Sequence, residues 1–253
     1  MRLVAGFRAA LGFLTRVPVG RIDAADMSLT RAGGYFPLVG AVVAAVATGV
    51  WWLGTSTAGP AAGAVLSVLA AVVVTGAIHE DGLADTADGL WGGADRDRRL
   101  QIMRDSRVGT YGVVAIAGDL AIRTAVLMPF GSGDLADATR ILVAGHVLGR
   151  AAPLVLAAVL PPARTDGQGS RLGRPGAGGT ALATVTVALA AVACAGWWAP
   201  VLVGAAAVPV LGLAVAARRR VGGATGDILG AGVALTNLTV AAVAAALIRE
   251  GLV

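Results

Sequence analysis

The chain has 253 residues, of which 57% are hydrophobic and only 14% are charged, and its mean hydropathy is +0.79. This composition is too apolar for a soluble domain and is typical of a membrane protein with several spans, organised as one domain over residues 1–253. The net charge of +5 comes from arginines that lie between apolar segments, so we exclude a nucleic-acid partner and expect membrane lipid or a phosphorylated small molecule. The single cysteine excludes a disulfide framework.

Residues 1–20 are predicted to form an amphipathic helix that lies in the membrane interface. Phe7 and Leu11 recur on one helical face, while Arg8 and Arg16 interrupt any continuous apolar core. This pattern argues against a cleaved signal peptide, which needs an unbroken apolar stretch.

Seven apolar segments of membrane-crossing length are predicted, which gives an all-α bundle of about seven spans. They cover approximately residues 35–53, 60–78, 111–130 and 135–160, a segment that ends at Trp197 and Trp198, and residues 200–217 and 228–248. Four of the polar segments contain sixteen arginines, whereas the turns near 54–59, 131–134 and 199 contain none. By the positive-inside rule, the arginine-bearing segments and the N-terminus lie in the cytoplasm.

The acidic and arginine-rich stretch 79–112 is predicted to carry most of the chemistry, in a cytoplasmic active-site segment at residues 79–110. It contains seven of the fifteen acidic residues and five of the twenty arginines. In a helical segment, Asp81, Asp85 and Asp88 fall at i, i+4 and i+7 and share one face, where they repel one another. Mg²⁺ prefers carboxylate and phosphate oxygens and would relieve that repulsion. The alternative is a solvated acidic loop without a ligand.

The charged residues near this triad each have two interpretations. Arg104 and Arg107 could bind phosphate through their forked guanidinium groups, or the arginines of this segment could only keep it in the cytoplasm. Asp227, at the start of the last apolar segment, is either a further carboxylate of the site or a charge that favours a helix N-terminus. His79, at the membrane boundary, could bind phosphate or act as an acid or base.

Two polar pairs at i, i+4 spacing are predicted inside apolar segments. Asp119 and Arg123 are expected to neutralise each other in the third segment, and His146 and Arg150 repeat the spacing in the fourth. A histidine in such a position is typically hydrogen-bonded to a neighbouring helix. No P-loop, H-E-x-x-H or G-x-S-x-G motif is present, so nucleotide hydrolysis by a P-loop and serine hydrolase chemistry are unsupported.

Several motifs resemble the cobalamin synthase family, the adenosylcobinamide-GDP ribazoletransferases. The most specific is HEDGLADTADGLWGG followed by RLQIMRDSRVGTYG; FLTRVPVG, YFPLVGA, GRAAPLVLAAVLPPARTDGQG and GGATGDILGA agree in order over nearly the whole chain. The resemblance implies an integral enzyme of a prokaryotic cytoplasmic membrane, with its active site facing the cytoplasm. Such an enzyme uses Mg²⁺ to join GDP-activated cobinamide to α-ribazole or its 5′-phosphate, with release of GMP. A homo-oligomer is left open.

The resemblance also implies roles for particular residues. The implied catalytic residues are His79, Asp88, Arg104 and Asp105, the implied substrate contacts are Ser106, Arg107 and Asp227, and the implied Mg²⁺ ligands are Asp81, Asp85 and Asp88. We expect Asp88 to accept the proton when the ribazole 5′-hydroxyl attacks phosphorus. This chain has Ala234 and Asn237 where the family pattern has acidic residues, so neither position is given a catalytic role.

Two other functions match parts of the pattern. A membrane phosphotransferase that joins a CDP-activated group to an alcohol uses a related aspartate motif, but with an arginine after the motif's alanine and a longer aspartate spacing. Here Ala84 is followed by Asp85. A cation-coupled transporter would place ionisable residues near the bilayer midplane, often in paired halves, whereas the carboxylates here cluster in one segment. Both differences favour the ribazole transferase.

Overall fold

The computed structural model describes residues 2–20, 29–164 and 175–253, which are helical apart from loops and one isolated β-bridge between Pro162 and Ala224. The elements are α1 (Arg2–Leu14), α2 (Leu29–Ala32), the 3₁₀ turn η1 (Gly33–Tyr35), α3 (Phe36–Ala58), α4 (Pro60–Thr75), α5 (Ile78–Gly92), α6 (Arg96–Ile102), α7 (Thr110–Leu127), α8 (Leu135–Gly149), α9 (Ala152–Val159), α11 (Ala177–Ala195), the 3₁₀ turn η2 (Gly196–Trp198), α12 (Ala199–Arg220) and α13 (Gly226–Arg249). The predicted all-α class is confirmed.

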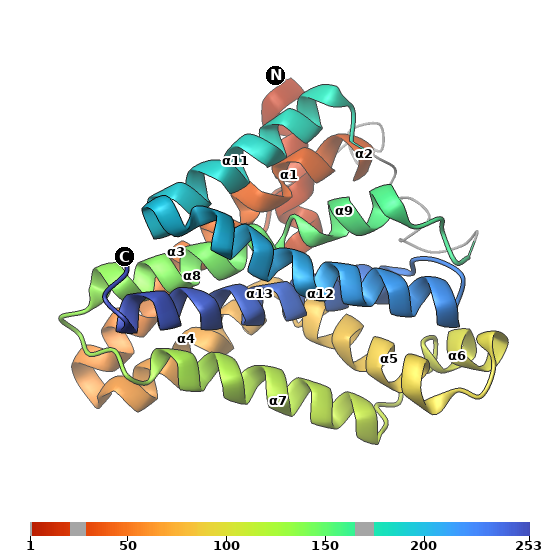
Figure 1. Ribbon diagram of the computed structural model, residues 1–253, viewed down its shortest axis with the longest axis horizontal. Helices are drawn as coiled ribbons and strands as arrows, with labels where there is room; N and C mark the ends of the chain where they lie inside the picture. The colour runs from red at the N-terminus through yellow and green to blue at the C-terminus, as the bar shows by residue number, and fades with distance from the viewer. Residues whose placement is uncertain (1, 21–28, 165–174) are drawn as a thin grey trace.

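Five helical stretches are long and apolar enough to cross a membrane. They are Gly33–Ala58, Thr110–Leu127, Leu135–Val159, Ala177–Arg220 and Gly226–Arg249, and α4 with α5 adds a sixth if that bent pair counts as one span. The stretch Ala177–Arg220 contains two helices, α11 and α12, because the chain turns back at η2 (Figure 1). A membrane helical bundle agrees with these findings, whereas the count of seven spans and the cytoplasmic N-terminus stay predictions.

The two kinds of connecting segment lie at opposite ends of the bundle. The turns α3–α4, α7–α8 and α11–α12, which lack arginine, lie together with the C-terminus at the left of Figure 1. The arginine-bearing residues 96–107 and 218–220 lie at the right, around α6, the start of α7 and the end of α12. For residues 96–107 and 218–220, the segregation that the charge pattern predicts is present in the fold, and the acidic helix α5 leads to this arginine-bearing end; α1 lies nearer the middle of the bundle.

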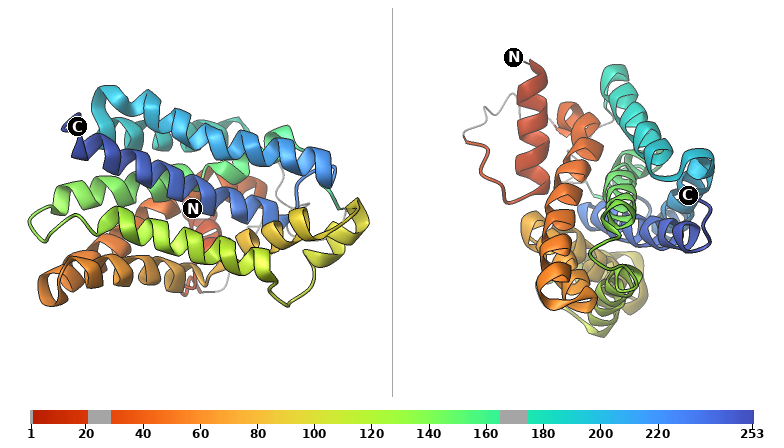
Figure 2. Two further views of the ribbon diagram at one scale, coloured as in Figure 1. Left: turned by 60° about the horizontal axis from the view of Figure 1, so that its bottom comes forward. Right: turned by 90° about the vertical axis from the view of Figure 1, so that its left-hand side faces the viewer.

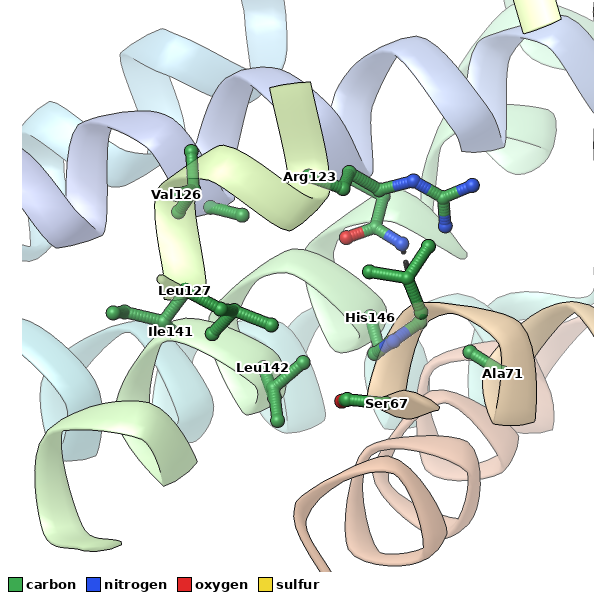
Figure 3. A pocket seen from close by; sticks show the side chains of 11 residues that line it. Ser67, Ala71, Arg123, Val126, Leu127, Ile141, Leu142 and His146 are labelled. Carbon is green, nitrogen blue, oxygen red and sulfur yellow. Dashed lines mark hydrogen bonds between the residues drawn. The ribbon is translucent and has the colours of Figure 1, made fainter. Parts of the chain in front are cut away.

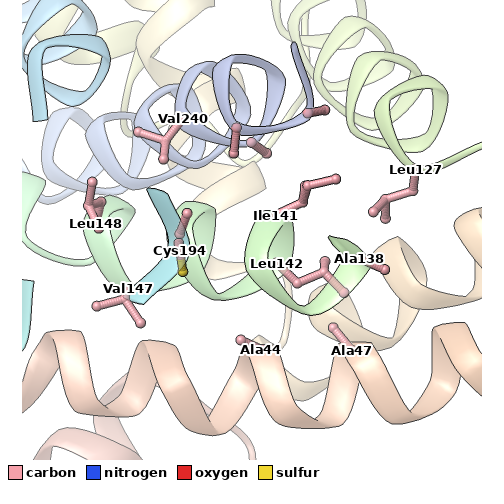
Figure 4. Close-up of a cluster of buried hydrophobic side chains, with 14 of the residues drawn as sticks. Ala44, Ala47, Leu127, Ala138, Ile141, Leu142, Val147, Leu148, Cys194 and Val240 are labelled. Atoms are coloured by element: carbon pink, nitrogen blue, oxygen red, sulfur yellow. The ribbon is translucent and has the colours of Figure 1, made fainter. Parts of the chain in front are cut away.

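Close helix packing surrounds α13, which contacts α5, α7, α8, α9 and α12 and is seen from two further sides in Figure 2. Buried apolar side chains of α3, α7, α8, α11 and α13 meet in one cluster, which includes the single cysteine, Cys194 (Figure 4). Many of these side chains are alanines, whose small size allows neighbouring backbones to approach closely, as is typical of helices in membranes.

Replacing Gly40 with alanine is expected to destabilise the bundle by about 1–3 kcal/mol, because α3 and α8 cross at this glycine. A Cβ there would lie 2.3 Å from the carbonyl oxygen of His146 and 2.9 Å from the Cα of Val147, and backbone atoms cannot rotate away. Thermal unfolding in detergent measures the loss. Gly49→Ala in the same helix is the control, since no atom lies within 4 Å of its Cβ position. Equal midpoints for the two variants would contradict the crossing.

A bend of 89° separates α4 from α5 and turns the acidic helix away from the apolar one. Gly76 and Ala77 both adopt the left-handed conformation, with φ of 65° and 58°. The amide of Gly76 donates to the carbonyl of Val73 at 3.1 Å and that of Ala77 to the carbonyl of Val72 at 2.9 Å, which closes α4. This conformation costs alanine about 1–2 kcal/mol, so contacts made by α5 itself must hold the bend.

Candidate active site

The helix α5 presents the predicted acidic face. Asp81 and Asp85 lie one turn apart on it, Asp81 exposed and Asp85 half-buried. The carboxylates of Asp81, Asp227 and Asp88 lie close enough to repel the charge of Asp85, and the guanidinium of Arg164 lies close enough to attract it. Negative charge from α5 and α13 is thus concentrated around Asp85, and the loop that follows α9 contributes one positive charge, that of Arg164.

A close contact between α5 and α13 brings Asp227 to this face. A Cβ on Gly82 would lie 2.8 Å from the carbonyl oxygen of Asp227 and 3.2 Å from the Cα of Gly230. Glycines on both helices therefore allow the backbones to approach. Thr225 caps α13 by accepting a hydrogen bond from the amide of Ile228 at 3.3 Å, which sets where the helix begins. Asp227 thus lies beside the acidic face of α5, and its role in substrate binding stays a prediction.

Arg164 is a residue of the site that the sequence reasoning did not single out. Its Nη2 donates to Oδ2 of Asp227 at 3.0 Å, and its side chain is only 16% exposed. No helical spacing links two residues so far apart in the sequence. The one signal that could have found it is its place within the PPARTDGQG motif of the family resemblance.

Asp88 is bound to the first turn of α7. Its Oδ2 accepts from the amide of Gly109 at 2.7 Å, and its Oδ1 accepts from the amide of Gly112 at 2.9 Å. Amides at a helix N-terminus lack partners within the helix, so a carboxylate from another helix satisfies them well. In this structure Asp88 therefore fixes α7 against α5.

The three aspartates of α5 do not converge on one point. Among the residues that the structure describes, no three His, Cys, Asp or Glu side chains are close enough to hold a metal ion together. The Mg²⁺ site of Asp81, Asp85 and Asp88 and the role of Asp88 as a base stay predictions.

His79 and Glu80 face the interior of the bundle. His79 lies about half a helical turn from Asp81 and is 5% exposed. Oε1 of Glu80 accepts from Nη2 of Arg123 at 2.8 Å. The structure thus does not bring His79 to the acidic face, although it directly precedes that face in sequence; its catalytic role stays a prediction.

These residues belong to a buried polar cluster between the helices. A small cavity there has polar lining from Thr75, His79, Glu80, Arg123, His146, Arg150 and Asn237. The predicted pairing of Asp119 with Arg123 is confirmed, because the two side chains form a salt bridge. Arg123 also binds Glu80, which the spacing did not predict. Figure 3 shows Arg123 and His146 beside an adjoining, mostly apolar pocket.

His146 is hydrogen-bonded to a neighbouring helix, as predicted. Its Nδ1 lies 3.2 Å from Nδ2 of Asn237 on α13 and 3.1 Å from Nη1 of Arg150. Asn237 also packs tightly, since a Cβ on Gly145 would lie 2.3 Å from its side-chain oxygen. Asn237 therefore joins α13 to α8, which is a structural role.

The loop between α6 and α7 carries the other predicted site residues. Asp105 forms a salt bridge with Arg107 at 2.6 Å, and Arg104, Ser106 and Arg107 are exposed. The hydrogen bonds from Arg107 lower the pKa of Asp105 to about 2, so Asp105 is ionised at neutral pH and is a poor proton acceptor there. In this structure Asp105 holds Arg107 in place, and its catalytic role stays a prediction.

Several arginines of the acidic segment and α12 bind backbone carbonyls. This role differs from both interpretations of the sequence, which were phosphate binding and retention of the segment in the cytoplasm. Arg96 donates to the carbonyl of Val221 at 3.1 Å and to that of Ala163 at 2.8 Å. Arg220 donates to the carbonyl of Leu90 at 2.7 Å. Val221 and Leu90 lie at the C-terminal ends of α12 and α5, where carbonyls lack partners within the helix and carry partial negative charge, so arginines suit them. These contacts hold α5, α6, α12 and the loop before Arg164 together.

Comparisons with known proteins match one family over nearly the whole chain. The model of a family described as cobalamin-5-phosphate synthase matches residues 6–245. A protein of Azorhizobium caulinodans described as adenosylcobinamide-GDP ribazoletransferase is 40% identical over 243 residues, which are 91% of this chain and 91% of that protein. A protein of Bradyrhizobium diazoefficiens with the same description is 39% identical over 249 residues, which are 96% and 94% of the two chains. No solved structure matches.

Proposed function

Because this chain belongs to the cobalamin-5-phosphate synthase family, we propose that it is a membrane transferase that completes the nucleotide loop of cobalamin. It joins GDP-activated adenosylcobinamide to α-ribazole or α-ribazole 5′-phosphate and releases GMP, giving adenosylcobalamin or its 5′-phosphate. The observation that carries the proposal is the family match over residues 6–245, which include every carboxylate around Asp85. Cobalt enters with the substrate and is not a cofactor of the protein.

The donor set on α5 fits a magnesium ion. Mg²⁺ in proteins is commonly bound by one or two carboxylates together with substrate phosphates. Asp81 and Asp85, one turn apart and repelled by their neighbours, supply that number of carboxylates, and the donor's diphosphate supplies further oxygens. When bound, Mg²⁺ neutralises charge on the diphosphate and makes phosphorus easier to attack.

The remaining residues orient the substrate around this pair. Asp88, through Gly109 and Gly112, holds the loop between α6 and α7 beside α5, so the loop's Arg104, Ser106 and Arg107 are kept near the donor. Asp227 adds a third carboxylate from α13. The protein performs a positioning and charge-neutralising task, which is the larger part of phosphoryl-transfer catalysis.

The enzyme is proposed to lie in the cytoplasmic membrane of a prokaryote with its active site facing the cytoplasm. Support comes from the arginines, which gather at the end of the bundle to which the acidic helix leads (Figure 1). Both substrates are polar and large, and this orientation gives them access from the compartment where nucleotide-activated intermediates occur.

The proposal is tested by turnover of the purified protein in liposomes. GDP-activated cobinamide, Mg²⁺ and either acceptor are supplied, and GMP and the corrinoid product are followed together. We expect equal amounts of both products, no reaction in EDTA and recovery when Mg²⁺ is restored. A folded protein that makes no product with either acceptor would contradict the activity. Product formation that persists in EDTA would support the proposed reaction and contradict its requirement for Mg²⁺.

A further inference from the structure

The backbone that carries Arg164 is held in place by contacts that do not involve its side chain. The amide of Ala163 donates to the carbonyl of Ala224 and the amide of Ala224 donates to the carbonyl of Pro161, both at 2.8 Å. A Cβ on Gly223 would lie 2.1 Å from the carbonyl oxygen of Pro161, so the loop lies directly on the turn between α12 and α13. Arg164 is therefore placed at the start of α13 by backbone pairing, and its side chain is not needed to keep it there.

The side chain of Arg164 extends into the negative charge around Asp85. It donates to Asp227 at 3.0 Å, is largely buried and is close enough to Asp85 to attract its carboxylate. Asp227 also accepts a hydrogen bond from Oγ1 of Thr225 at 3.1 Å, so it keeps a partner if the guanidinium moves. A planar guanidinium carries five N–H donors, and pairs of them match two oxygens of one phosphate.

Arg96, at the start of α6, contacts the same loop and provides a contrast. Its Nε and Nη2 donate to the carbonyls of Val221 and Ala163, and its Nη1 donates to the exposed carboxylate of Asp97. Arg164 instead binds a carboxylate of the site. Of these two arginines, only Arg164 has its guanidinium beside the carboxylates of the proposed diphosphate site.

We propose that Arg164 is a substrate-contact residue that binds a phosphate oxygen of the donor's diphosphate, and that its ion pair with Asp227 holds it over the site between turnovers. This inference rests on the proposed function. A cation bound to the carboxylates weakens their attraction for the guanidinium, while the arriving diphosphate offers it a stronger, bidentate partner. Arg164 then moves from carboxylate to phosphate over a short distance, on a backbone that stays fixed.

The test measures binding as well as turnover, in the full-length protein. Isothermal titration with GDP and with inorganic pyrophosphate, in Mg²⁺, compares the wild type with Arg164→Gln. We expect binding of both probes to weaken by about tenfold to a hundredfold, the range expected for a lost charged hydrogen bond, and the KM for the cobinamide donor to rise. Arg140→Gln, on α8 at the other end of the bundle, is the control and leaves binding unchanged.

A second variant separates phosphate binding from simple neutralisation of Asp227. If Arg164 only neutralises that carboxylate, Arg164→Gln with Asp227→Asn restores probe binding to that of Asp227→Asn alone, and the inference is overturned. If Arg164 contacts phosphate, binding by the double variant stays weak. Arg164→Lys, which keeps the charge, shows an intermediate loss and serves as the folded reference if Arg164→Gln does not fold. Wild-type protein without turnover contradicts the proposed function, whereas unchanged probe binding in Arg164→Gln contradicts only this inference.

Discussion

Replacing Asp85 with asparagine is expected to lower turnover by at least about a hundredfold. Asp85 is the carboxylate around which Asp81, Asp227 and Asp88 are arranged, and asparagine keeps its size while removing the charge that attracts a cation. Because those neighbours repel Asp85, the substitution removes a repulsion from the folded protein. The midpoint of thermal unfolding in detergent should therefore stay the same or rise, which separates a loss of chemistry from a loss of fold.

The matched control is Asp97→Asn in the same acidic segment. The side chain of Asp97 is 90% exposed and forms a surface salt bridge with Arg96. Surface pairs of this kind contribute about 0–1 kcal/mol, so neither stability nor turnover should change measurably. Equal turnover in the Asp85 and Asp97 variants would contradict the site on α5 but leave the reaction itself in place.

Replacing Arg123 with methionine is expected to destabilise the protein by about 3–5 kcal/mol, the largest stability effect that we predict. Arg123 is buried between α5 and α7, where it forms salt bridges with Glu80 and Asp119. Methionine leaves both carboxylates buried without their cation, which is far less favourable than removing the whole group. Because Glu80 lies in the first turn of α5, the loss should also loosen the bend at Ala77.

Two comparisons test the origin of this loss by thermal unfolding in detergent. Arg140→Gln removes an arginine from a half-exposed pair with Asp137 and should cost less than about 1 kcal/mol. Adding Asp119→Asn to Arg123→Met removes one buried negative charge and leaves Glu80 with Arg150, whose buried guanidinium lies close enough to attract it, so most of the stability should be recovered. A double variant as unstable as Arg123→Met would show that the packing of the arginine, and not its charge, stabilises the cluster.

Features that depend on neighbouring residues in the chain were predictable from the sequence. Long apolar segments identify the membrane helices, because the composition of one segment decides whether it can be buried in lipid. The acidic face of α5 and the pair of Asp119 with Arg123 follow from helical spacing, since residues four apart lie on one side of a helix. The place of Asp227 at the start of an apolar segment, directly after a glycine-rich turn, is likewise visible in the sequence.

The contacts that complete the site link residues distant in sequence, and packing alone decides them. Asp88 meets the amide of Gly109 only because α7 begins beside α5. Arg164 reaches Asp227 because a β-bridge places its loop on the start of α13.

His79 is the opposite case, a residue that is close to the acidic face in sequence but not in the structure. It adjoins the acidic face in sequence, but the bend at Gly76 and Ala77 sets where α5 starts and turns His79 inward. The sequence by itself therefore determined that the chain is helical and which charged residues are candidates for the site. Only the tertiary structure decided which of those residues meet, because that depends on how helices cross and not on the spacing within any one of them.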